Sequence, residues 1–198
     1  MLRLFVGIAL PPELKLRLSL ICTGVSGARW VDAGNLHVTL RFIGEVDEAT
    51  AGDIDAALAR IRAAAFPLTL AGVGHFGERS LWAGVEHNAA LLHLHDKVES
   101  ALVRAGLAPE GRRYAPHVTL ARLKGKADAR LRSFLSEHAL FRSDPFAVAQ
   151  FSLVASLLTK SGAIYEDQAD YPLAGAAQEW GAAREWGAER GWDRDRGG

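Results

Sequence analysis

His37-Val-Thr-Leu40 and His117-Val-Thr-Leu120 are two copies of one tetrapeptide that stand eighty residues apart in the chain. Each copy lies in an apolar, β-branched run, which predicts one strand over 36–43 and another over 117–123. Side chains at positions i and i+2 share one face of a strand, so each copy places an imidazole and a hydroxyl on one side and Val and Leu on the other. If a pseudo-twofold axis relates the two strands as neighbours, both polar faces converge on one small volume.

The segments around the two copies follow a recurring order of strand and helix. Apolar residues at helical spacing, together with the positions of Pro and Gly, predict helices over 12–23, 47–65, 88–105 and 128–139. Apolar and β-branched runs predict further strands over 2–10, 29–31, 68–72, 80–85, 146–158 and 164–173. Gly72 and Gly74 are interpreted as part of the turn region between two of these strands.

The composition excludes several classes of protein. The chain has 198 residues, of which 49% are hydrophobic, and its 23 Lys and Arg balance 23 Asp and Glu. This apolar content can bury a core, so the chain is not disordered overall. Cys22 is the single cysteine, which excludes an intrachain disulfide and favours the cytoplasm. The apolar N-terminus is too short for a signal peptide, and no stretch approaches the roughly 18 apolar residues of a membrane helix, so we expect no membrane contact.

The zero net charge hides an uneven distribution. Residues 112–132 contain seven basic residues and one acidic residue, a local excess of +6 around the second tetrapeptide. Three of these basic residues adjoin the strand that carries His117, namely Arg112, Arg113 and Lys124. Two interpretations of them are open, contact with RNA phosphates and ordinary solvated loops.

The composition changes from Ala174 onward. Trp180, Trp186 and Trp192 recur every six residues among Gly and charged residues. This period fits neither a helix face nor a strand face, which predicts a folded domain over 1–173 and a low-complexity tail over 174–198. Evenly spaced Trp residues can also stack on bases, so RNA contact by the tail is an alternative.

The paired His and Thr residues suit chemistry on a phosphodiester. Its hydrolysis needs a base for the attacking oxygen and an acid for the leaving oxygen, and His, with an ordinary pKa of about 6.5, can be neutral in one copy and protonated in the other. The hydroxyls and an Arg can hold the non-bridging oxygens. A metal site on His37 and His117 is the alternative, but neither has a Cys or carboxylate beside it at a usual ligand spacing.

The residues around the motifs extend this pattern. Arg29-Trp30-Val31 precedes the first motif, Arg41-Phe-Ile-Gly-Glu45 follows it, and Pro116 and Arg122 flank the second. With the opening Arg3-Leu-Phe-Val-Gly-Ile and the closing Tyr171-Pro-Leu173, the chain resembles the two-histidine (2H) phosphoesterases, and within them the RNA 2′,3′-cyclic phosphodiesterases, also called 2′-5′ RNA ligases. The resemblance covers residues 1–173.

The resemblance implies a bilobal α+β fold, in which two antiparallel sheets related by a pseudo-twofold axis surround a central cleft and the helices lie outside. It also implies hydrolysis of 2′,3′-cyclic phosphate ends of RNA, or of small cyclic nucleotides, to 2′-phosphates without a metal or another cofactor. His37 would be the general acid and His117 the general base. Thr39, Thr119 and Arg122 would bind the phosphate, Phe42 would stack on the base, and Arg62 is a weaker candidate for the other face of that base.

Two alternative functions remain open on the same residues. In 2′-5′ RNA ligation a 5′-hydroxyl would replace water and the chemistry would run in reverse. In a nucleotide-binding or RNA-binding module the histidines would bind phosphate without turnover. In each case we expect a monomer.

Overall fold

The computed structural model describes residues 1–124, 129–158 and 163–175 and confirms an α+β fold. Its elements are β1 (Leu2–Ala9), α1 (Pro12–Ile21), β2 (Ala28–Trp30), the 3-10 helix η1 (Ala33–Asn35), β3 (His37–Val46), α2 (Glu48–Leu58), β4 (Phe66–Leu68), β5 (Leu70–Phe76), β6 (Ser80–Val85), α3 (Ala89–Arg104), β7 (His117–Leu123), α4 (Ala129–Glu137), β8 (Phe146–Val148), β9 (Gln150–Leu158) and β10 (Ala163–Pro172). The predicted tail over 174–198 lies almost entirely outside the described residues.

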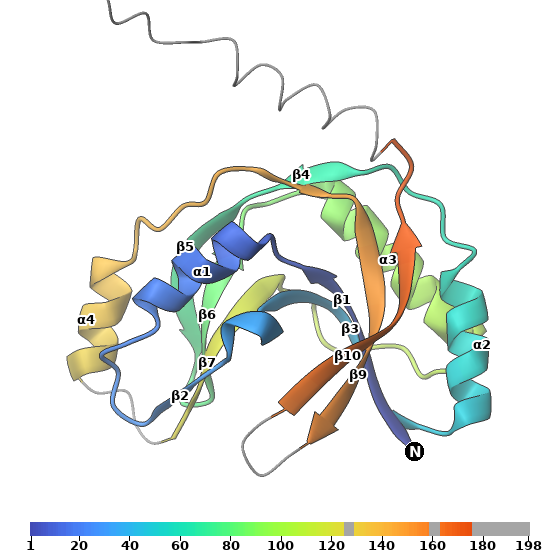
Figure 1. Cartoon of the computed structure of the whole chain (residues 1–198), viewed down its shortest axis with the longest axis horizontal. Helices are drawn as coiled ribbons and strands as arrows, with labels where there is room; N and C mark the ends of the chain where they lie inside the picture. The colour runs from blue at the N-terminus through green and yellow to red at the C-terminus, as the bar shows by residue number, and fades with distance from the viewer. Residues whose placement is uncertain (125–128, 159–162, 176–198) are drawn as a thin grey trace, which may run out of the picture.

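The main sheet consists of two antiparallel halves. Its strands run in the order β10-β9-β1-β3-β7-β6-β5, and β2 pairs with the other edge of β7. The halves β10-β9-β1-β3 and β7-β6-β5 with β2 meet through one residue pair, Val38 opposite Val118. The two expected sheets are therefore joined into one path at this pair. In Figure 1, α1 and α4 flank the half that contains β5 to β7, and α2 and α3 flank the other half.

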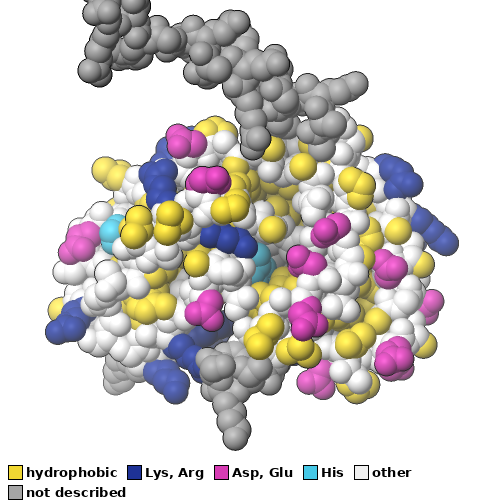
Figure 2. Space-filling view, viewed as in Figure 1, with side chains coloured by type: hydrophobic (Ala, Val, Ile, Leu, Met, Phe, Trp, Pro, Cys, Tyr) yellow, Lys and Arg dark blue, Asp and Glu magenta, His cyan; other side chains and the backbone are white. Residues whose placement is uncertain are grey.

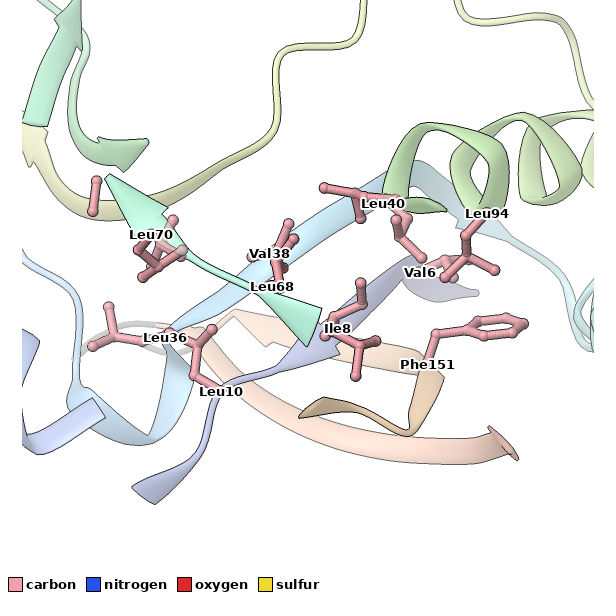
Figure 3. Close-up of a cluster of buried hydrophobic side chains, with 14 of the residues drawn as sticks. Val6, Ile8, Leu10, Leu36, Val38, Leu40, Leu68, Leu70, Leu94 and Phe151 are labelled. Atoms are coloured by element: carbon pink, nitrogen blue, oxygen red, sulfur yellow. The ribbon is translucent and has the colours of Figure 1, made fainter. Parts of the chain in front are cut away.

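Apolar side chains of both halves form one continuous core. Val6 and Ile8 of β1 and Val38 and Leu40 of β3 are all at most 2% exposed. Figure 3 shows Leu94 of α3 packed toward this group from one side. The figure also shows Leu10, Leu36, Leu68, Leu70 and Phe151 around it. Because β3 has its Val and Leu in this core, its His and Thr must face the opposite side of the sheet.

The predicted helix over 47–65 is too long. It starts as expected, where the Asp47 carboxylate accepts a hydrogen bond from the Thr50 N–H at 2.8 Å, but it ends at Leu58. Beyond it, Ala63 and Ala65 exchange backbone hydrogen bonds of 2.8 Å with Ala174. These long-range bonds hold the segment extended, and Pro67 disfavours a helical residue before it. Local Ala and Leu content could not reveal this pairing.

The interpretation of Gly72 and Gly74 as turn residues is wrong. Both lie within β5, and the turn comes later, where the Arg79 N–H donates to the Phe76 carbonyl at 3.1 Å. A Cβ on Gly74 would lie 2.3 Å from the Trp82 ring of β6. This glycine therefore makes room for a flat indole on the neighbouring strand.

Arg41 ties the sheet to its outer layer. Its Nε donates to Glu99 of α3 at 2.6 Å, and its Nη2 donates to the Ala108 carbonyl at 2.8 Å. The Arg41 side chain is 11% exposed and that of Glu99 is 21% exposed. The pair thus fixes β3 against α3 in a partly desolvated place.

We expect Arg41→Gln to lower the free energy of unfolding by roughly 1.5–3 kcal/mol, because it leaves the Glu99 carboxylate without its charged partner. Urea unfolding followed by circular dichroism measures this change. Arg142→Gln is the matched control, since Arg142 forms an exposed pair with Glu86 at 2.7 Å, and it should have a clearly smaller effect. Equal effects of the two substitutions would contradict a structural role of the Arg41 pair.

Candidate active site

The pairing of Val38 with Val118 brings the two tetrapeptides together. The strands are antiparallel and paired at equivalent residues, which makes the contact a local pseudo-twofold axis. Both valines are 0% exposed, so they point into the core. The residues on either side of them, His37 and Thr39 on β3 and His117 and Thr119 on β7, therefore point to the opposite face. The structure thus assembles the predicted group of two imidazoles and two hydroxyls.

A β-bulge follows the Thr residue in each strand. Gly7 pairs with Thr39 and Val6 with Arg41, which leaves Leu40 as an extra residue in β3. In the same way Trp82 pairs with Thr119 and Leu81 with Ala121, which leaves Leu120 as an extra residue in β7. An extra residue reverses the alternation of faces beyond it. Phe42 and Arg122, each five residues after its His, are thereby turned onto the face that carries the imidazoles.

Backbone carbonyls orient both imidazole rings. Nδ1 of His37 lies 2.7 Å from the Asn35 carbonyl oxygen, and Nδ1 of His117 lies 2.7 Å from that of Ala115. A carbonyl can only accept, so each Nδ1 carries a hydrogen and each Nε2 is the atom free to exchange a proton. Nε2 of His37 lies 3.0 Å from the Thr39 hydroxyl, which can donate to it in the neutral state.

The surroundings of both histidines disfavour the protonated imidazole. Burial, partly offset by the Asn35 carbonyl, and the positive charges of Lys15, His117 and Arg122 together lower the pKa of His37 to about 4. Burial also lowers the pKa of His117, the Ala115 carbonyl raises it, and Arg122 lowers it. The positive charges of Lys15 and Arg122 therefore make this site electropositive, which favours an anion.

Aromatic rings surround each imidazole, and the motifs did not single them out for this role. Phe5 stacks on His37 with ring centroids 4.6 Å apart, and Tyr165 meets its edge at 5.3 Å. Phe76 meets His117 edge-on at 4.9 Å, and Trp82 lies 6.3 Å from it. Four different strands supply these rings, so only a correct pairing of distant strands could have identified them.

The remaining predicted residues lie in different surroundings. Phe42 is 43% exposed, with the Arg3 guanidinium 5.1 Å from its ring centroid, so one partner for stacking is already present. Arg62 lies beyond the end of α2, and its Nη1 donates to the Ala59 and Ile61 carbonyls at 2.8 and 3.0 Å. These bonds hold the Arg62 guanidinium at the end of α2, so the structure does not place it beside the two motifs.

The three candidates for RNA backbone contact are exposed. Arg112 is partly engaged, since its Nε donates to Glu110 at 3.3 Å. Arg113 precedes β7, and the backbone N–H of Lys124 donates to the Gly27 carbonyl at the far end of that strand. Lys126 and Asp128, which also belong to the basic stretch, lie outside the described residues.

Figure 2 shows a histidine side chain recessed near the middle of one face, with a basic side chain next to it and acidic side chains on its other side. Within residues 1–124, 129–158 and 163–175, no three His, Cys, Asp or Glu residues form a group that could hold a metal ion. No helix in this part of the chain has the length and apolar character to cross a membrane.

Comparisons with known proteins agree with this geometry. A model of the 2′-5′ RNA ligase superfamily matches residues 17–158. The chain is 39% identical over 158 residues to an RNA 2′,3′-cyclic phosphodiesterase of Aeropyrum pernix, which covers 77% of this chain and 89% of that protein. It is 34% identical over 176 residues to the enzyme of that name in Thermotoga maritima, with 83% of this chain and 92% of the relative covered.

Solved structures give the same result. A crystal structure of Escherichia coli LigT in complex with 3′-AMP superposes with a TM-score of 0.73 at 28% identity, covering 87% of this chain and 98% of that one. A structure described as a phosphoesterase superposes with a TM-score of 0.75 at 28% identity over the same shares. The fold and the paired motifs thus define a two-histidine phosphoesterase. The chain belongs to the 2′-5′ RNA ligase superfamily, as its motifs indicated.

We expect His37→Gln to reduce the loss of stability in acid. In the folded state His37 has a pKa of about 4 instead of 6.5, so between these values the unfolded chain binds a proton that the folded chain does not. The contribution of His37 to the free energy of unfolding is therefore fully present above pH 6.5. It falls by up to roughly 3 kcal/mol as the pH approaches 4. Urea unfolding of both proteins at pH 7, 5.5 and 4.5 measures the difference. The same decline in both proteins would refute the assignment, and His75→Gln, on an exposed part of β5, serves as the control.

Proposed function

We propose that the protein is a phosphodiesterase that hydrolyses the 2′,3′-cyclic phosphate at the 3′ end of RNA to a 2′-phosphomonoester, without a metal ion. The observation that carries this proposal is the pair of imidazoles on one face of the β3–β7 contact, each with Nδ1 bound to a carbonyl, which leaves Nε2 as the nitrogen that can exchange a proton. The names of the relatives in Aeropyrum pernix and Thermotoga maritima support the choice of substrate.

The reaction needs two proton transfers on opposite sides of the phosphorus. His117 Nε2 takes a proton from water as the water oxygen bonds to phosphorus. The bond from phosphorus to O3′ breaks, and His37 Nε2–H gives its proton to O3′, which leaves a 3′-hydroxyl and a 2′-phosphate. His117 ends protonated and His37 neutral, and exchange with solvent restores both. Family resemblance supports the choice of His37 as the acid.

The neighbouring side chains suit the charge on the phosphate. The hydroxyls of Thr39 and Thr119 share the face of the two imidazoles, and the bulge at Leu120 turns Arg122 toward it. Hydroxyl and guanidinium donors stabilise the non-bridging oxygens as negative charge develops on them. Phe42 offers an exposed ring on the same side for the terminal base, and Arg112, Arg113 and Lys124 are candidates for contact with a longer RNA.

The substrate itself supplies part of the electrostatics. Burial lowers the pKa of His37 and so favours its neutral form, which is the wrong state for an acid. The phosphate diester carries a negative charge, and an anion next to an imidazole favours the protonated form. Binding of the substrate therefore raises the pKa of the acid in the complex, so the catalytic protonation state forms with the substrate in place.

We expect His37→Gln and His117→Gln each to lower kcat for a 2′,3′-cyclic mononucleotide by about 10²–10⁴-fold, the usual contribution of a general acid or base. Release of the 2′-phosphomonoester, followed by ion-exchange chromatography, measures the rate. His75→Gln should retain the parental rate, and addition of EDTA should not inhibit. Near-normal turnover by either active-site variant would reject the paired mechanism, and inhibition by EDTA that added divalent metal reverses would reject metal independence.

The pH dependence offers a second test. In the free enzyme the pKa of His37 is about 4, and that of His117 also lies below its ordinary value of 6.5. Since one imidazole must be protonated and the other neutral, kcat/KM should be highest between about pH 4 and 6.5 and fall above this range. The optimum of kcat should lie at higher pH, because the bound phosphate raises the pKa values. Initial rates after brief exposure to each pH separate this effect from unfolding, and a kcat/KM optimum above pH 7 would contradict it.

A further inference from the structure

A recess opens beside His37, on the half of the sheet that does not carry His117. Its floor consists of Phe5 and Gly7 on β1 and Val154 on β9. Its polar walls come from α1, from the segment before β3, from β9 and from β10, and these polar residues are Lys15, Asn35, Ser152, Tyr165 and Asp167. Residues of β6 and β7 do not line it. The recess thus continues the catalytic face past His37 and away from the second motif.

The size of the recess suits a substituent of the substrate. Its volume is about 110 Å³, below the roughly 300–1,000 Å³ of pockets that enclose a complete ligand. A Cβ on Gly7 would lie 3.1 Å from the Phe5 ring and 3.3 Å from the His37 ring. The absence of a side chain at Gly7 therefore leaves space next to the imidazole. A group that is covalently attached to the reacting phosphate ester can therefore extend from His37 into this space.

The two charged residues of the recess lie at opposite ends of it. The Lys15 ammonium donates to the Gly34 carbonyl at 2.8 Å. Among the positive charges that lower the pKa of His37, that of Lys15 has the largest effect, so Lys15 lies at the His37 end of the recess. Asp167 pairs with Val154, and Val154 pairs with Phe5, so the carboxylate lies two strand spacings, roughly 10 Å, beyond β1. The end next to the catalytic imidazole is positive and the far end is negative.

The chemistry of a nucleotide decides which group lies there. O3′ is attached to C3′, and C3′ continues through C4′ and C5′ to the phosphodiester of the preceding nucleotide. The base is attached to C1′, and the proposed function assigns it to Phe42, which does not line the recess. When His37 faces O3′, the 5′ substituent of the terminal nucleotide leaves the ribose on the His37 side.

We propose that this recess is the subsite for the 5′ substituent of the terminal nucleotide, with Lys15 in contact with the phosphodiester that joins it to the preceding nucleotide. The inference rests on the proposed function and on His37 as the acid. The Asp167 carboxylate at the far end repels a second phosphate, so the subsite binds one upstream phosphodiester and no further one. The enzyme should therefore prefer a dinucleotide with a cyclic end to a cyclic mononucleotide, and a trinucleotide should bring little further gain.

The test compares kcat/KM for uridine 2′,3′-cyclic phosphate and for the uridine dinucleotide with the same cyclic end, measured on one preparation of each protein. The parent should prefer the dinucleotide, and Lys15→Gln should reduce this preference about fivefold, the order expected of one partly exposed ion pair. Any effect of Lys15 on the pKa of His37 is common to both substrates and cancels in the ratio, as does any loss of folded protein. Lys97→Gln, the same exchange on α3 and outside the recess, should leave the ratio unchanged.

A substrate with an uncharged linkage between the nucleosides tests whether Lys15 recognises the negative charge of the phosphodiester. When a methylphosphonate replaces the phosphodiester between the two nucleosides, the parent should show the reduced preference of Lys15→Gln, and the variant should not distinguish the two linkages. An unchanged ratio in Lys15→Gln, or an equal fall in Lys97→Gln, would overturn the subsite. Absence of turnover of both the mononucleotide and the dinucleotide by the parent would instead refute the proposed function, so the two failures are distinguishable.

Discussion

The antiparallel contact between Val38 and Val118 is the constraint on which the site depends. Among the described residues it is the one strand pair that joins the two halves of the sheet, and its register decides that His37 and Thr39 share a face with His117 and Thr119. A shift by one residue would turn the polar residues of one motif to the core face and separate them from those of the other motif. Burial of both valines opposes such a shift, so the same apolar contact that stabilises the fold also sets the catalytic geometry.

The two halves share a backbone design and differ in the side chains placed on it. In each half a carbonyl two residues before the His holds Nδ1, and a bulge at the following Leu turns a residue onto the catalytic face. That residue is the aromatic Phe42 in one half and the cationic Arg122 in the other. In the proposed function this one local geometry serves a base on one side and a phosphate on the other, which would divide the recognition of a nucleotide between the halves.

Burial and nearby positive charges disfavour the protonated imidazole that the proposed mechanism requires. Burial lowers both pKa values, and the nearby cations lower them further. A substrate with a fixed negative charge reverses the second effect, because it screens the cations and pairs with the imidazolium. The same cations make the site attractive for that substrate. Selectivity for an anion and activation of the acid therefore have one physical origin.

The sequence by itself determined the two strands, the pairing of imidazole with hydroxyl on each, and the family, because period-two alternation and an exact repeat are local properties. The special roles of Phe42 and Arg122 followed only from the family resemblance, since simple alternation from His37 and His117 places them on the wrong face. The tertiary structure decided the Val38 contact, the bulges that turn these side chains, the ring of Phe76 beside His117, and the early end of α2. Each of these arises from hydrogen bonds or packing between segments far apart in the chain, and no local pattern encodes which distant strand a residue will meet.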